Sequence, residues 1–69
     1  MEELIGNTAG QIWQYLDKQG PVTIIKLKSE LGISNSTLYL ALGWLSREDK
    51  INIIDFEQSF KISLKNGKT

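Results

Sequence analysis

The fold is decided by residues 31–45, LGISNSTLYLALGWL. Gly32 can adopt the left-handed backbone conformation that ends a helix, and Ile33 fills the corner that follows. Ser34 can cap the next helix, because its hydroxyl accepts a hydrogen bond from a backbone N–H group of the first turn. From Leu38 to Leu45 the apolar residues recur at the spacing of one helical face. The stretch therefore predicts the turn and the second helix of a helix-turn-helix.

The chain before residue 20 predicts a first helix. Asn7 or Thr8 can cap it, and Gly20 followed by Pro21 ends it, because proline cannot continue the helical hydrogen-bond ladder. Its apolar positions have the i, i+3, i+4, i+7 spacing of one buried face. We therefore expect core side chains at Ala9, Ile12, Trp13 and Leu16.

A short second helix is predicted between this stop and the turn at Gly32. Thr23 can cap it, and Ile24, Leu27 and Leu31 share its apolar face. Val22 precedes it and is expected to be an extended residue that pairs with a later strand.

The third helix has two distinct faces. One is the core stripe, and the opposite face carries Ser36, Leu40, Gly43 and Arg47, with Tyr39 and Trp44 on its flanks. Asp49 and Lys50 are expected to close the helix.

Residues 51–56 and 59–64 alternate apolar and polar side chains around the polar pair Glu57-Gln58, which predicts a β-hairpin. The order of elements is that of an α+β winged helix-turn-helix with three helices, a short strand and a two-stranded wing. We expect one domain over residues 1–69, ordered from about residue 5 to about residue 64, with a frayed tail at 65–69.

Composition narrows the function. The 69 residues include no histidine and no cysteine, so no Ser-His or Cys-His catalytic pair and no zinc site of the usual nitrogen and sulfur ligands can form. No glycine-rich phosphate loop is present, and we expect neither an enzyme nor a cofactor, metal or small-molecule substrate.

Eight basic residues balance eight acidic ones, so no global field attracts nucleic acid or an anionic membrane. Without a signal peptide or a membrane-spanning run, the expected location is the cytoplasm.

The third helix also carries a family likeness. Its segment Tyr39-Leu-Ala-Leu-Gly-Trp-Leu45, followed by Arg47-Glu48, resembles a group of small stand-alone winged helix-turn-helix proteins of unassigned function. The likeness runs from Ile5 to about Leu64. It implies a winged-helix fold, a homodimer, and a DNA-binding role in transcription regulation inferred from the fold.

The start of the third helix is the candidate DNA-reading element. Asparagine can pair with adenine, and hydroxyls can contact bases or phosphates; the candidates are Asn35, Ser36, Thr37 and Tyr39, with Arg47, Lys26 and Lys28 for phosphates. The alternative is that these short polar residues are simply a solvated helix start. No basic residue lies between Ser34 and Ser46, and Asp55 and Glu57 make the wing tip acidic, so any DNA affinity should be weak and sensitive to salt.

The outward face of the same helix is also a candidate protein interface. Leu40, Gly43 and Trp44 form an apolar patch, although Trp44 could instead cover the root of the wing. Ile54 and Phe56 lie on the outer face of the wing and form a second candidate interface. The sequence therefore leaves two functions open: binding of double-stranded DNA, or a module that contacts a second copy or another protein without binding DNA.

Overall fold

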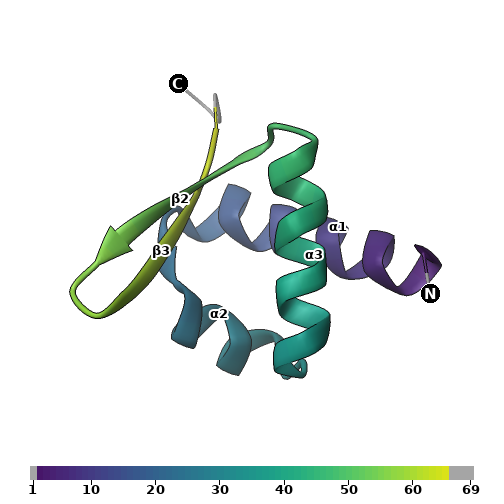
Figure 1. Cartoon of the computed structure of the whole chain (residues 1–69), viewed down its shortest axis with the longest axis horizontal. Helices are drawn as coiled ribbons and strands as arrows, with labels where there is room; N and C mark the ends of the chain where they lie inside the picture. Colours follow the sequence, from purple (N-terminus) through teal and green to yellow (C-terminus); the bar gives the residue numbers. More distant parts are fainter. Residues whose placement is uncertain (1, 66–69) are drawn as a thin grey trace.

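The computed structural model describes residues 2–65 of the protein. Figure 1 shows α3 crossing α1, and the hairpin of β2 and β3 extending away from the helices. The elements are α1 (Glu2–Gln19), β1 (Val22–Thr23), α2 (Ile24–Leu31), α3 (Asn35–Arg47), β2 (Ile51–Phe56) and β3 (Ser59–Leu64). This is the α+β winged helix-turn-helix that the sequence predicts.

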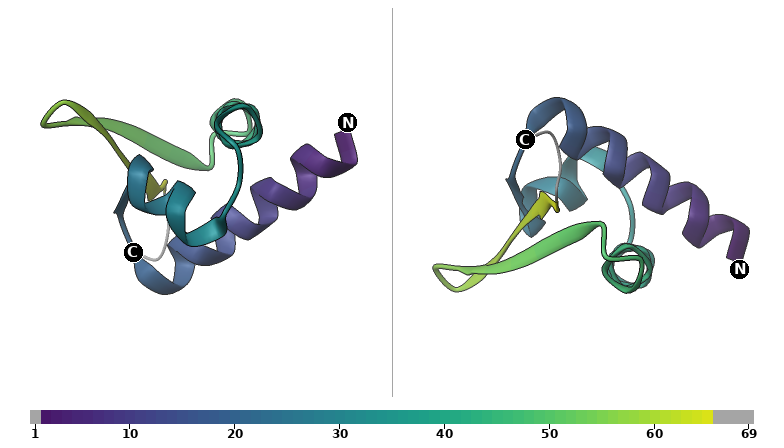
Figure 2. Two further views of the ribbon diagram at one scale, coloured as in Figure 1. Left: turned by 90° about the horizontal axis from the view of Figure 1, so that it is seen from below. Right: turned by 90° about the horizontal axis from the view of Figure 1, so that it is seen from above.

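The strands form one antiparallel sheet with the order β1-β3-β2. β2 and β3 pair over their full length, from Ile51 opposite Leu64 to Phe56 opposite Ser59. β1 contributes the pairs of Val22 with Ile62 and Thr23 with Lys61. Figure 2 shows the hairpin edge-on, with α3 seen along its axis beside the root of β2. The expected pairing of Val22 with the wing is confirmed, and β3 becomes the central strand.

A single core joins the three helices to the root of the wing. The largest fully buried side chains are Ile12 of α1, Leu27 of α2, Leu38 of α3 and Ile62 of β3. Each of the three helices and the central strand β3 thus places a large side chain in the core, as the helical and strand periodicities predict. The other buried apolar residues of the cluster are Ala9, Leu16, Val22, Ile24, Ala41, Leu42, Leu45 and Ile51.

The predicted turn chemistry is present. Gly32 lies in the left-handed region at φ 62° and donates its N–H to the carbonyl of Lys28. The Ser34 hydroxyl accepts from the backbone N–H of Thr37 at 3.2 Å, and the Thr23 hydroxyl caps α2 in the same way at 3.2 Å from Lys26 N. These local bonds hold α2 and α3 at the angle of a helix-turn-helix.

Asp49 and Lys50 close α3, as the sequence predicts, from just beyond its last helical residue. The helix ends at Arg47, and Asp49 takes the left-handed conformation at φ 62°. The N–H groups of Asp49 and Lys50 bond back to the carbonyls of Ser46 and Leu45 at 3.0 and 2.9 Å, which is the pattern of a Schellman motif. Lys65, expected in the frayed tail, is also anchored, since its N–H donates to Lys50 O and its Nζ lies 2.6 Å from Asp49 Oδ1. Residues 66–69 of that tail lie outside the described chain.

Two predictions for α1 are wrong. The helix does not begin at Asn7 or Thr8 but already includes Glu2, and Thr8 is buried on the core side. Ile5 lies one helical turn before Ala9, and this apolar position extends the buried face upstream of the presumed caps. Trp13 is not a core residue, because 38% of its surface is exposed. It lies at the margin of the core stripe, on the side that faces the groove between α1 and α3.

Candidate functional site

The outward face of α3 is exposed along its whole length. Tyr39 is 54% exposed, Leu40 48% and Trp44 42%, and Asn35, Ser36 and Arg47 are exposed as well. Gly43 lies among them, and a Cβ added there would meet no atom within 4 Å. α3 therefore offers one continuous face whose beginning is polar, whose middle is apolar and whose last residue is basic.

The polar beginning of this face is an organised hydroxyl cluster. Ser34 Oγ donates to Thr37 Oγ1 at 3.0 Å while it accepts from Thr37 N, and it lies 3.4 Å from Ser36 Oγ. Thr37 is half-buried and its hydroxyl is engaged within the cap, whereas Asn35, Ser36 and Tyr39 are exposed. Of the predicted base-contacting residues, Thr37 is thus half-buried and bonded to Ser34 through both its hydroxyl and its N–H group, whereas Ser36 is exposed and lies 3.4 Å from Ser34 Oγ.

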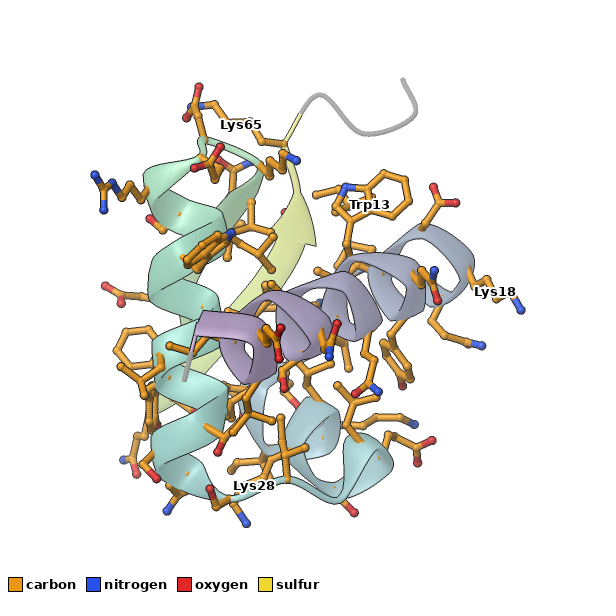
Figure 3. All side chains as sticks on the ribbon, turned by 90° about the vertical axis from the view of Figure 1, so that its right-hand side faces the viewer. Trp13, Lys18, Lys28 and Lys65 are labelled. Carbon is orange, nitrogen blue, oxygen red and sulfur yellow. The ribbon has the colours of Figure 1, made fainter. Side chains whose placement is uncertain are left out.

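The predicted phosphate-binding cations do not form one patch. Figure 3 shows Lys28 at the end of the molecule where α3 begins, whereas Lys18 projects from the far end of α1 and Lys65 lies where α3 ends. Lys26 instead borders a surface hollow beside β1, together with Lys61 of β3. Arg47 is the last residue of α3, about 18 Å along the helix axis from Asn35 at 1.5 Å per residue. Lys28 is therefore the predicted cation nearest to the polar start of α3.

The wing gives little positive charge to this side of the molecule. Asp55 and Glu57 are exposed at its tip, and Glu57 adopts a left-handed turn conformation at φ 57°. At the root of the wing, Lys65 is paired with Asp49, so the charge of this lysine is already balanced within the protein. A phosphate backbone approaching the tip would meet acidic side chains.

Trp13 and Trp44 line one hollow between α1 and α3, which the sequence alone does not predict. The hollow has a volume of about 280 Å³, and Gly6, Gly10 and Lys50 also border it. Trp44 is thus partly covered without becoming a core residue. Periodicity could have placed both tryptophans on the flanks of their helices, but only the crossing of the helices shows that the flanks meet.

The wing presents a second apolar area. Ile53 is 46% exposed, Ile54 50% and Phe60 42%. Ile53 and Ile54 are consecutive, so they project from opposite faces of β2. The predicted interface residue Ile54 is therefore accessible, while the side chain of Phe56 lies outside the described part of the structure.

Within residues 2–65, no three acidic side chains gather as they would around a metal ion. None of the described helices combines the length and the apolar character needed to cross a bilayer.

Comparison with known proteins supports the same architecture. A model of the winged helix-turn-helix domain (DUF2582) matches residues 1–64. The uncharacterized protein MJ1608 of Methanocaldococcus jannaschii is 35% identical in an alignment of 63 residues that covers 88% of this chain and 90% of that protein. The family model spans the helix-turn-helix and both strands of the wing. The chain belongs to the winged helix-turn-helix domain family, DUF2582.

Proposed function

We propose that this protein binds duplex DNA through the first half of α3, with Asn35, Ser36 and Tyr39 toward the base edges and Lys28 toward a phosphate. The observation that carries the proposal is the continuous exposure of the α3 face next to Lys28, at the end of the molecule where α3 begins. In a helix-turn-helix the second helix enters the major groove by its N-terminal residues. Asparagine, serine and tyrosine supply the donors and acceptors that this groove can match.

The charges favour weak binding. The chain has no net charge, and Lys28 and Arg47 are the cations nearest to the two ends of the α3 face. Each phosphate contact contributes a slope of about −0.9 to the dependence of log affinity on log salt, so two contacts give a slope of about −1.8. A single domain should therefore bind at low salt and release DNA at moderate salt.

The test is fluorescence anisotropy with a labelled random duplex at about 50 and about 200 mM salt. Lys28→Ala should weaken binding and reduce the salt slope by about 0.9, because one phosphate contact is lost. Lys18→Ala removes an exposed lysine from the far end of α1, away from the α3 face, and should change nothing. Absence of binding at the lower salt, or equal losses in the two variants, would refute the proposal.

A second candidate function is a protein-interaction module without DNA binding. It is favoured by the exposed side chains of Tyr39, Leu40 and Trp44 at the centre of α3, since aromatic residues are typical anchors of protein interfaces. Leu40→Gln should then abolish capture of the partner. The same variant should leave nonspecific DNA binding unchanged, because it removes no positive charge.

A further inference from the structure

The two edges of the sheet are protected to very different degrees. β1 is two residues long, follows Pro21 and leads directly into α2, so it offers little backbone for pairing. β2 is six residues long and forms the other edge. It contains no lysine, no proline and a single charged residue, Asp55. An apolar edge strand of this length without such protection is a template for another strand.

The register shows which backbone groups are free. Phe56 and Ser59 face each other across the two-residue turn, so this pair exchanges its hydrogen bonds, and the pairs alternate from there. Ile54 and Asn52 consequently bond to β3, whereas the N–H and C=O groups of Ile51, Ile53 and Asp55 point away from it. Within residues 2–65, no other segment bonds to these outward groups.

We propose that β2 pairs antiparallel with the β2 strand of a second copy, so that Ile53 lies opposite Ile53 of the partner subunit. The two edges are related by a two-fold axis normal to the sheet, so the cores of both copies lie on the same face of the joined sheet. This symmetry also requires that one residue of β2 lies opposite the same residue of the other copy. Centring the register on residue 53 pairs every outward group, because Ile51 then faces the partner's Asp55. A register centred on residue 52 or 54 leaves an outward residue of each strand without a partner.

Side chains and charges support a second copy as the occupant. Ile53 and Ile54 are each about half exposed on opposite faces of β2, and both would lose part of this exposure. Arg47 and Lys50 precede the strand, while Asp55 and Glu57 lie at its far end. Of the acidic residues beside the basic end, Asp49 is neutralised by Lys65 and only Glu48 remains. Antiparallel pairing brings the basic end of each strand against the acidic tip of its partner.

Single cysteines test the register, because the chain has no cysteine of its own. Ile53→Cys should form a disulfide-linked dimer under mild oxidation, since residues directly opposite in a hydrogen-bonded pair have Cα atoms about 5.5 Å apart. Ile54→Cys is the matched control. It would be diagonal to its copy at about 7–8 Å, beyond the reach of a disulfide, and should stay monomeric on a denaturing gel.

The assembly itself is measured by sedimentation of the native chain over a range of about 10 µM to 1 mM. We expect a dimer that Ile53→Pro dissociates, because proline removes an outward N–H group that the hairpin does not use. Circular dichroism checks that this variant is folded, and Leu40→Gln on α3 should remain dimeric. A native monomer at about 1 mM, crosslinking of Ile54→Cys as fast as that of Ile53→Cys, or dissociation by Leu40→Gln alone would overturn the proposal. None of these readouts depends on DNA binding.

Discussion

Replacing Gly43 by alanine should stabilise the isolated protein by about 1 kcal/mol. Glycine in the interior of a helix costs about this much relative to alanine, because it loses more backbone freedom on folding. Gly43 lies in the middle of α3, is exposed, and has no atom within 4 Å of the position of a Cβ. For a domain of this size, a stabilisation of about 1 kcal/mol corresponds to a rise of about 4–8 °C in the unfolding midpoint.

Two other glycines serve as controls. Gly10 lies within α1 and is equally free of neighbours, so Gly10→Ala should also raise the midpoint. Gly32 has the same open surroundings but a φ of +62°, and alanine in that conformation costs about 1–2 kcal/mol. Thermal unfolding followed by circular dichroism, with urea titrations to check that the slope is unchanged, should therefore give two increases and one decrease.

The same variants test why α3 keeps a glycine at its exposed centre. If a DNA backbone or a partner side chain approaches Gly43 closely, Gly43→Ala should weaken binding although the fold is more stable. Gly10→Ala should gain stability without that loss. A lower midpoint for Gly43→Ala would refute the reasoning, because it would mean that the α3 face is not open in the isolated protein. A higher midpoint with unchanged binding of every partner would leave the glycine without a role in an interface.

Three further substitutions probe the cap, the core and the ion pair. Ser34→Ala removes the acceptor of the Thr37 N–H bond and should cost about 1 kcal/mol, seen as a fall of about 4–8 °C in the midpoint. Ile62→Ala leaves a cavity at a fully buried position and should lower the free energy of unfolding by about 2–5 kcal/mol. A core of this size supplies about 3–5 kcal/mol, so a calorimetric scan that starts at 37 °C should show no cooperative unfolding transition. Lys65→Met breaks the pair with Asp49, but because the two side chains are 40% and 71% exposed, urea unfolding should change by less than about 1 kcal/mol.

The parts of the fold that depend on local chemistry could be predicted from the sequence. The Gly32 turn, the Thr23 and Ser34 caps and the core stripe of α3 each follow from a residue type at a fixed spacing. The register of the wing follows from strand alternation around Glu57-Gln58. These rules act between residues a few positions apart, so no tertiary information is needed.

The errors have tertiary causes. Thr8 has the chemistry of a helix cap, but it lies within α1, where the surrounding core buries it. Trp13 satisfies the helical periodicity of a core residue, yet it lines a hollow, because periodicity gives the direction of a side chain and not whether a neighbour covers it. The strand order β1-β3-β2 also depends on how the helices pack, because their packing places β1 beside β3. This order leaves β2 as the free edge of the wing.

Pairing of β2 also bears on DNA binding, because it doubles the charge that can meet one duplex. If Lys28 and Arg47 each contact a phosphate, a monomer has a salt slope of about −1.8 and a dimer with both copies engaged about −3.6. Between about 50 and about 200 mM salt, the affinity should then fall about 12-fold for the monomer and about 150-fold for the dimer. Ile53→Pro changes no charge, so its slope should be half that of the native chain. Equal slopes for a dimeric native chain and a monomeric variant would mean that one copy alone contacts DNA. In that case the acidic residues of the wing tip, Asp55 and Glu57, would serve to contact the basic end of the partner's β2 strand, and they would have no role in binding phosphates.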